Sequence, residues 1–250
     1  MRTAMRTLAG VLAVQVCLAA GAQAQLVRAW SEKDSGTGYL LFGAARLDVA
    51  SLNAALERSA YQQVIRSPLN DMEDSAISFG LGSHGVVHGV VIGWELQWLS
   101  LRETTNPTGT HRAALRGGCG QLNVGFLTYS AEGLDIYPML GIGASRLDLT
   151  ITQRSALAFG QVLQDPDRAV HLRTGGFLLS PSLGADYLLP LARSSERLSG
   201  VVVGLRLGYG LAPMQGGWEL DGSDVVGGPQ ASLSGPYVRL LAGVGSRRNE

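Results

Sequence analysis

The chain has 250 residues, enough for one large all-β domain, and its formal net charge is zero. Charged residues make up 16% of it, below the roughly 25% that is usual in soluble proteins. Because no basic run stands out, the composition gives no indication of a nucleic-acid partner. Glycine accounts for 34 residues, about twice its usual share, and in strands glycine suits places too crowded for a larger side chain.

The first 24 residues have the features of a secretory signal peptide. Two arginines form its charged start, an apolar stretch follows over residues 8–20, and Ala22-Gln23-Ala24 forms a small-x-small cleavage site. A retained membrane anchor is the alternative, but a spanning helix needs about 20 apolar residues. We therefore expect residues 1–24 to be removed and residues 25–37 to form a polar lead-in to the folded domain.

The stretch from Val90 to Trp98 alternates between two kinds of side chain. A strand points successive side chains to opposite faces, so one face here is wholly apolar and the other is small or polar. The apolar parity holds Val90, Ile92, Trp94, Leu96 and Trp98, and the other holds Val91, Gly93, Glu95 and Gln97. The chain repeats this pattern about eight times and offers no helices to cover the apolar face, which we therefore interpret as facing lipid around a narrow lumen.

Eight segments carry this alternation, and most reach the 9–11 residues that a tilted strand needs to cross a bilayer. They are predicted at Gly38–Leu47, Ser75–Gly82, the stretch from Val90 to Arg102, Arg112–Thr128, Leu134–Thr152, Val170–Leu189, Ser199–Leu211 and Gly235–Gly245. We predict an all-β fold, a closed antiparallel up-and-down transmembrane barrel over residues 38–246, with a tail at residues 247–250. Closure matters because an open sheet edge in hydrocarbon would leave unpaired backbone groups.

The connections alternate in length, as in barrels with short periplasmic turns and long outer loops. The short ones are predicted at Ser83–Gly85, Ser130–Gly133 and Pro190–Leu198. The longer ones are the segment between the first two strands, Glu103–Thr110, Gln153–Ala169 and Pro213–Ser234.

One connection, Asp48–Val64, has a helical pattern, with apolar residues at three- and four-residue spacings. Asp48 is a suitable N-cap, and Ser67-Pro68 ends the segment. We expect a short loop helix resting on the barrel mouth; a plug and a partner-binding helix are the alternatives.

Aromatic residues near the strand ends agree with interface girdles. Trp98 and Tyr209 are placed near outer ends and Tyr187 near an inner end. Prolines count against the interpretation because each removes a ladder hydrogen bond, and Pro181, in mid-strand, would require a bulge.

Six polar side chains are predicted to project into the lumen at similar heights: Glu95, Gln97, Gln121, Asn123, Arg206 and Arg239. An eight-stranded barrel is wide enough only to be filled by side chains. Since an unpaired buried charge is very costly, we expect Glu95 to pair with Arg206 or Arg239. A narrow water or ion path is the alternative.

The sequence predicts no catalytic, cofactor or metal site. His84 and His88 flank a predicted inner turn, too isolated for a closed metal site. Cys17 lies in the predicted signal, where lipidation is the alternative, which leaves Cys119 as a single packed thiol on the lumen parity, with no internal disulfide. His111 and His171 bracket outer loops.

These features together resemble the small eight-stranded outer-membrane β-barrel proteins, the OmpA/OmpX-like group. The resemblance covers about residues 38–245 and rests on the signal sequence, strand count, alternation and loop asymmetry. It implies export to the outer membrane of a Gram-negative-type bacterium, with outer-membrane lipid as a partner. One departure is the end of the chain, Gly245 to Glu250, which lacks the terminal aromatic residue usual in such barrels.

Three functional classes remain open. The first, which we favour, is a structural or surface-interaction barrel whose outer loops meet an extracellular ligand, a protein or lipopolysaccharide. The second is a small passive channel. The third is a lipid A-modifying enzyme, for which His171 with Ser155 and Asp165 or Asp167 can be imagined. A soluble lipocalin-like barrel is the main architectural alternative.

Overall fold

The structure, a computed structural model, describes residues 35–57, 70–106, 110–153, 169–193, 197–220 and 222–248. The predicted signal peptide therefore lies outside the described residues, as does most of the lead-in. Within the described part, no helix has both the length and the apolar content needed to span a membrane.

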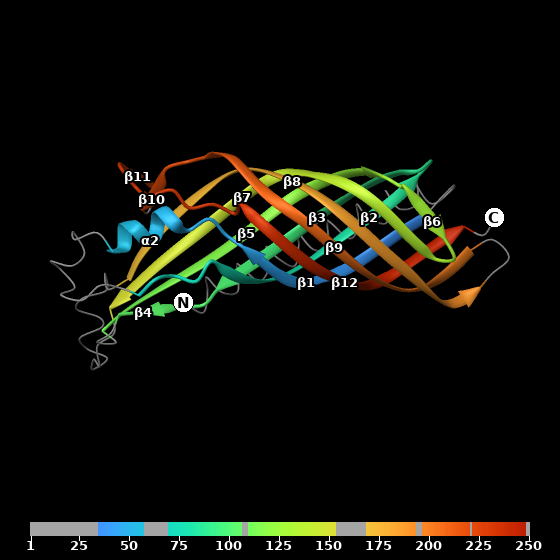
Figure 1. Cartoon of the computed structure of the whole chain (residues 1–250), viewed down its shortest axis with the longest axis horizontal. Coiled ribbons are helices and arrows are strands. Elements are labelled where there is room, and N and C mark those ends of the chain that lie inside the picture. Colours follow the sequence, from blue (N-terminus) through green and yellow to red (C-terminus); the bar gives the residue numbers. More distant parts are fainter. Residues whose placement is uncertain are drawn as a thin grey trace, which may run out of the picture.

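The structure has eight long strands, which wind around one axis as Figure 1 shows. They are β1 (Ser35–Arg46), β2 (Ser75–Val87), β3 (Val90–Leu101), β5 (His111–Phe126), β7 (Leu134–Gln153), β8 (Ala169–Arg193), β9 (Arg197–Gln215) and β12 (Gly235–Arg248). One helix, α2 (Ala50–Glu57), and four short strands occupy the ends: β4 (Thr104–Thr105), β6 (Tyr129–Ala131), β10 (Trp218–Leu220) and β11 (Ser223–Val225).

The long strands close into a ring of antiparallel neighbours. Each pairs with the next in sequence, β7 pairs with β8, and β12 pairs with β1 along the register Ser35↔Arg247 to Ala45↔Tyr237. Every long strand therefore has a partner on both sides, and no backbone edge is left open along the barrel wall. The predicted fold class is confirmed.

The strands are longer than the sequence predicts at several ends. β1 begins at Ser35, inside the predicted lead-in, and β12 continues to Arg248, inside the predicted tail. The predicted turn at Ser83–Gly85 is wrong, because β2 runs on to Val87 and the chain turns at His88 and Gly89. Both turn residues have positive φ, 51° and 80°, the geometry of the two-residue hairpin turn that matches strand twist.

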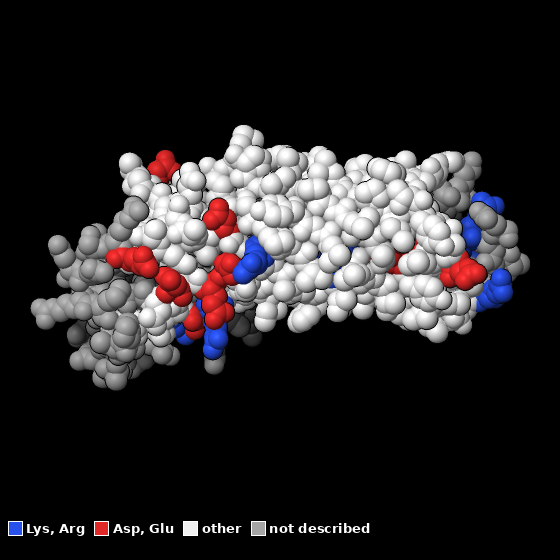
Figure 2. Space-filling view, in the orientation of Figure 1, with Lys and Arg blue, Asp and Glu red and all other residues white. Residues whose placement is uncertain are grey.

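The middle of the barrel is apolar outside. Exposed residues on the outward parity include Leu40, Phe42, Ile77, Phe79, Leu122, Val124, Leu140, Ile142, Leu183, Leu205, Leu207, Val238 and Leu240. On the face seen in Figure 2, charged side chains gather toward the two ends of the barrel and leave the middle nearly free of charge. A contiguous exposed apolar surface of this extent is unusual for a soluble protein and matches the belt of membrane barrels. The soluble lipocalin-like alternative is therefore wrong.

The pattern inverts toward the outer end, which carries the long loops. Along β3, Glu95 and Gln97 point inward, but Leu99 and Leu101 further out are the buried residues and Ser100 between them is exposed. On β7, Leu147 and Leu149 are buried while Arg146 is exposed. A wall that is apolar inside and polar outside is that of a water-surrounded barrel, so the inversion marks where the strands leave the membrane.

Strand length agrees with this inversion. The 20 residues of β7 span roughly 66 Å at ~3.3 Å per residue, or about 50 Å along the axis at a tilt of about 40°. An apolar belt is only about 25 Å tall. About half of the length of β7 therefore lies outside hydrocarbon.

An apolar core fills this outer part of the barrel. It contains Leu47, Val49, Leu52, Leu56, Met72, Ala76, Leu99, Leu101, Ala113, Leu115, Leu147, Leu149, Ile151, Leu178, Trp218, Ala231 and Leu233. Two of these, Leu52 and Leu56, come from α2, so the helix contributes to the core and closes the outer mouth. The helix begins at Ala50, two residues after the predicted start, and the part of the prediction beyond residue 57 lies outside the described residues.

Hydrogen bonds anchor the connection that contains α2 near both of its ends. The Asn53 side-chain amide donates to the Met72 carbonyl and accepts from the Met72 N–H, both at 3.0 Å. Asp48 exchanges two backbone hydrogen bonds with Ser232, and its carboxylate accepts from the Ala50 N–H at 3.4 Å. These bonds hold the helix over the mouth.

Pro181 lies where the β8–β9 ladder is irregular. The register shifts between Phe177 and Leu179, and Ser180 and Pro181 have no partner on β9 between the pairs Leu179↔Leu211 and Ser182↔Gly208. Because proline has no N–H to donate, the break in pairing toward β9 costs no hydrogen bond from Pro181 itself. Toward β7, Pro181 still lies opposite Leu140.

Candidate functional site

A cluster of buried charges fills the lumen below the apolar core, and Glu95 lies at its centre. The Glu95 carboxylate forms an ion pair with Arg206 and lies 3.4 Å from Nη1 of Arg239. Its oxygens also accept hydrogen bonds from Tyr39 at 3.3 Å, Gln97 at 2.8 Å and Gln121 at 3.2 Å. Glu95 is 1% exposed, so these partners replace its hydration.

Arg206, also 1% exposed, joins the two halves of the cluster. Its guanidinium donates to the hydroxyls of Tyr39 at 3.0 Å and Tyr137 at 3.2 Å, and to Nδ1 of His84 at 3.3 Å. The five donors of an arginine have fixed directions, so these partners hold the side chain in one orientation.

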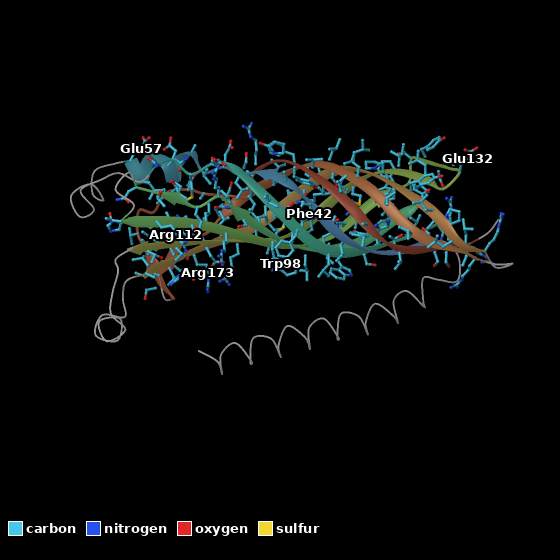
Figure 3. The ribbon with its side chains drawn as sticks, turned by 90° about the horizontal axis from the view of Figure 1, so that it is seen from below. Phe42, Glu57, Trp98, Arg112, Glu132 and Arg173 are labelled. Carbon is cyan, nitrogen blue, oxygen red and sulfur yellow. The ribbon has the colours of Figure 1, made fainter. Side chains whose placement is uncertain are left out.

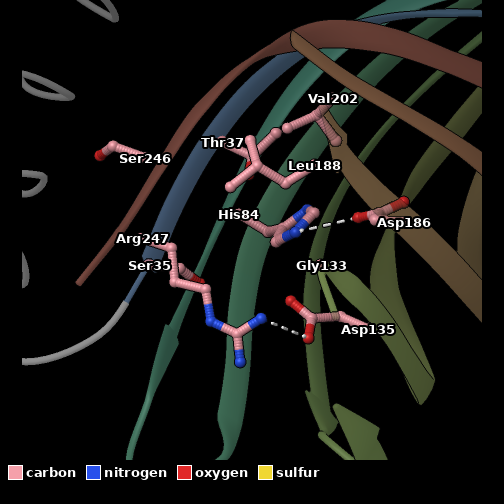
Figure 4. Close-up of a pocket in the computed structure, with 10 residues that line it drawn as sticks. All are labelled: Ser35, Thr37, His84, Gly133, Asp135, Asp186, Leu188, Val202, Ser246 and Arg247. Carbon is pink, nitrogen blue, oxygen red and sulfur yellow. Dashed lines mark hydrogen bonds and ion pairs between the residues drawn. The ribbon is translucent and has the colours of Figure 1, made fainter. Parts of the chain in front are cut away.

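His84 and Asp186 form the inner half of the cluster. His84 Nε2 lies 3.2 Å from the Asp186 carboxylate, which also accepts from the Tyr137 hydroxyl at 2.5 Å. Because an arginine can only donate, Nδ1 of His84 is the acceptor in its contact with Arg206, and Nε2 is the ring nitrogen that faces Asp186. Both residues line a small pocket at the inner mouth, beside an ion pair between Arg247 and Asp135 at 3.4 Å (Figure 4).

Arg239 has a different environment. Its guanidinium carbon lies 3.6 Å from the centre of the Tyr237 ring, within the range of a cation–π contact. The Tyr237 hydroxyl is in turn hydrogen-bonded to Ser180 at 2.8 Å.

The charges in this cluster balance. Glu95 and Asp186 supply two carboxylates, and Arg206 and Arg239 supply two guanidinium groups. A balanced, hydrogen-bonded cluster is the form in which charges are tolerated away from water.

The six polar residues predicted for the lumen all lie in it and are all buried. All six belong to one network: Gln97, Gln121, Arg206 and Arg239 contact Glu95 directly, and Asn123 joins through Gln121, which donates to it at 3.0 Å. Arg206 and Arg239 both pair with Glu95, where the sequence left the choice between them open.

Four members of the cluster were not predicted as such: Tyr39, His84, Tyr137 and Asp186. His84 was assigned to an inner turn, which is wrong because β2 extends past it into the wall. The sequence did contain one indication of these residues: Asp186 is a second carboxylate on the inward face, and a second buried carboxylate requires a second partner. Glycine makes room for it: a Cβ on Gly204 would lie 2.1 Å from the Asp186 carboxylate.

The three predicted interface aromatics point outward. Trp98 stacks on Phe79 with ring centroids 5.3 Å apart and lies three residues before the outer end of β3; Figure 3 shows it on the outside of the barrel wall. Tyr209 lies opposite Pro236 at the outer start of β12, and Tyr187 lies opposite Leu134 near the inner end. These places fit the two edges of an apolar belt.

The remaining candidates have ordinary surroundings. Cys119 is a free thiol that packs against the outer apolar core. His171 Nδ1 is hydrogen-bonded to Thr150 at 3.2 Å, whereas Ser155, Asp165 and Asp167 lie outside the described residues. Among described residues, no group of three or more histidine, cysteine or acidic side chains could hold a metal ion.

Comparison with known proteins gives matches among solved structures. No family model matches the sequence, and no curated protein does. Ail, the attachment invasion locus protein of Yersinia pestis, is 10% identical with a TM-score of 0.41, covering 87% of this chain and 100% of Ail. OprG of Pseudomonas aeruginosa is 10% identical (TM-score 0.34; 87% and 97% covered), and the protease OmpT of Escherichia coli 11% (0.37; 87% and 96%).

These similarities concern the fold alone, and the structure itself supplies the argument. The ring is closed, its belt is apolar, its interior is polar and filled, and its wall becomes polar outside once it passes the belt. In such a wall the backbone N–H and C=O groups are hydrogen-bonded between neighbouring strands, and the outer face is suited to contact with hydrocarbon. The chain is a closed, antiparallel, eight-stranded β-barrel with the apolar outer belt and filled polar lumen of a transmembrane barrel.

Proposed function

We propose that this protein is a closed, non-conducting barrel that acts through its outer surface, by binding and not by catalysis or transport. The observation that carries the proposal is the apolar core in the outer part of the barrel. It fills the mouth with side chains from five of the eight long strands (β2, β3, β5, β7 and β8), from α2 and from the outer connections, so an ion would have to pass among apolar side chains. Hydrophobic constrictions of this kind block conduction by excluding water.

The lumen below supports the same proposal. Glu95, Arg206 and Arg239 occupy the cross-section as paired charges, and Tyr39 and Tyr137 pack around them. An ion would have to displace these pairs at a large cost. Among the described residues, what remains accessible from outside is the raised wall of β7 and β8 with the β10–β11 hairpin.

Planar-bilayer recordings test the proposal. The folded protein should give no discrete conductance steps, and a variant with Leu52→Asp and Leu56→Asp, which makes α2 polar, is the matched attempt to open the mouth. Discrete steps from the unaltered protein would overturn the proposal in favour of a channel. Acyl-chain analysis of lipid A after expression tests the catalytic alternative; a protein-dependent change in acylation would establish an enzyme.

A further inference from the structure

A row of alternating charges crosses the outward face of the barrel just beyond the apolar belt. The register places Ser100 opposite Arg116, Arg116 opposite Asp148, Asp148 opposite Arg173, and Arg173 opposite Glu219. The row thus runs over β3, β5, β7, β8 and β10. Arg146 lies two residues nearer the belt, on the same face of β7.

Asp148 is the centre of this row. It accepts from Arg146 through Nε at 3.1 and 3.0 Å and through Nη2 at 2.8 Å, and from Arg173 Nε at 3.1 Å. Burial raises the pKa of Asp148, but the hydrogen bonds and charges of the two arginines outweigh it, so its pKa lies below the ordinary value. Asp148 is therefore ionised, and the two arginines are held in place with about half of each exposed.

Positive charge is in excess here and balanced elsewhere on the outer end. Arg46, Arg102 and Arg112 each have a carboxylate of their own, at 3.3, 3.4 and 2.9 Å. In the row, by contrast, Arg146 and Arg173 share Asp148, and Arg116 is exposed with no bonded partner among the described residues, so three arginines stand beside two carboxylates, Asp148 and Glu219. An anion placed here would find two held guanidinium groups and one unengaged group.

The position of this surface relative to the membrane determines which molecules it contacts. Gly118 lies opposite both Trp98 and Arg146, so the charged residues begin in the cross-strand row that holds an outer aromatic of the belt. Figure 3 shows Arg173 toward the outer end from Trp98. Residues just outside the hydrocarbon belt lie among lipid head groups. The neighbours of Arg146 on β5 and β8 are Gly118 and Gly175, so no side chain directly beside it shields its stem.

A cleft adjoins the row. It has a volume of about 330 Å³ and is lined by Asp148, Leu149, Thr150, His171, Leu172, Arg173, Glu219 and Gly222. Its lining combines carboxylates, a hydroxyl, an imidazole and a guanidinium, which offer both donors and acceptors. The hydroxyl groups of a sugar need such a mixture, and the volume lies at the lower end of the range for small-ligand sites.

We propose that this surface binds the phosphorylated sugar head group of an outer-leaflet glycolipid. Arg116, Arg146 and Arg173 bind the phosphate, to which guanidinium groups are well matched, and the cleft takes the sugar. The proposal deepens the surface role proposed above and rests on the barrel spanning the outer membrane. It concerns lipid held beside the barrel and needs no soluble partner.

Lipid retention tests the proposal. The purified barrel in detergent is titrated with bisphosphorylated lipid A, and bound lipid is counted by native mass spectrometry. We expect binding that weakens with salt and that falls about a hundredfold in the Arg116→Gln, Arg146→Gln, Arg173→Gln variant, from the usual contribution of each cation at an anionic membrane surface. Arg116→Gln alone breaks no bond and should cost about fivefold.

The matched control is Arg46→Gln, Arg102→Gln, Arg112→Gln, which removes three outer arginines that already have carboxylates. It should bind as the unaltered protein does, and a gel shift on heating confirms that each variant is folded. Equal loss in this control, equal binding of dephosphorylated lipid A, or full displacement by inorganic phosphate would overturn the proposal. None of these outcomes bears on conductance, so the proposed function is judged separately.

Discussion

Replacement of Glu95 by alanine tests the buried charge cluster. The change removes the carboxylate that faces Arg206 and Arg239, both at most 5% exposed, and leaves two guanidinium groups in the lumen with neutral partners. Breaking a buried ion pair by deleting one member typically costs about 3–5 kcal/mol, because the other charge stays buried. Arg206 keeps its tyrosine and histidine contacts and Arg239 its ring contact, so we expect a loss of about 3–5 kcal/mol and not more.

Urea unfolding in lipid vesicles, followed by the mobility difference between folded and unfolded bands, measures this loss. Glu103→Ala is the matched control, since that carboxylate is 40% exposed beside Arg112 and an exposed pair is worth only about 0–1 kcal/mol. The double variant Glu95→Ala with Arg206→Met should be less unstable than the sum of its parts. If Glu95→Ala were as stable as Glu103→Ala, the charge cluster would not hold the lumen as described.

Three further predictions concern other parts of the barrel. Gly204→Val should destabilise the fold, because even a Cβ there meets the Asp186 carboxylate, whereas Gly38→Val should be tolerated, since nothing lies within 4 Å; the heat-modifiable gel shift compares them. Leu52→Asp should expose the outer mouth to protease while the belt stays folded, at a cost near the 2–5 kcal/mol of large core truncations. Asp148, whose pKa is lowered in the folded state, should stabilise the outer wall above its unfolded pKa of about 3.9, and this contribution should disappear as the pH falls below that value; Asp148→Asn should abolish the pH dependence.

The alternation of side chains was sufficient to predict the ring and its belt. When strands have one apolar and one polar face over many residues and no helices are available to cover the apolar face, few folds other than a membrane barrel are possible. The lumen residues from Glu95 to Arg239 then follow from the alternation alone. Parity says which side a residue faces, and it holds even where a strand end is misplaced. The ends were harder, because a stretch such as Ser83–Gly85 has turn residues by composition while its neighbours pair it into the wall.

The outer core was not predicted, and the reason is physical. Leu99, Leu101, Leu147 and Leu149 continue the same alternation as the belt, but with apolar residues on the opposite parity. Where the surroundings of the wall change from lipid to water, apolar side chains move from the outward face to the inward face. The sequence of a single strand does not show where the membrane ends. Reading several strands together does, because Arg116, Arg146 and Arg173 first appear on the outward parity where the inward parity turns apolar.

The most direct test is what the outward side chains touch. Single cysteines at Phe42, Leu122 and Arg112, introduced with Cys119→Ser and spin-labelled, report accessibility to oxygen and to a water-soluble nickel chelate in lipid bilayers. We predict that labels at Phe42 and Leu122 collide with oxygen and not with nickel, and that the label at Arg112, beyond the belt, does the reverse. Nickel-accessible labels at Phe42 and Leu122 would show that water surrounds the belt and would contradict the account.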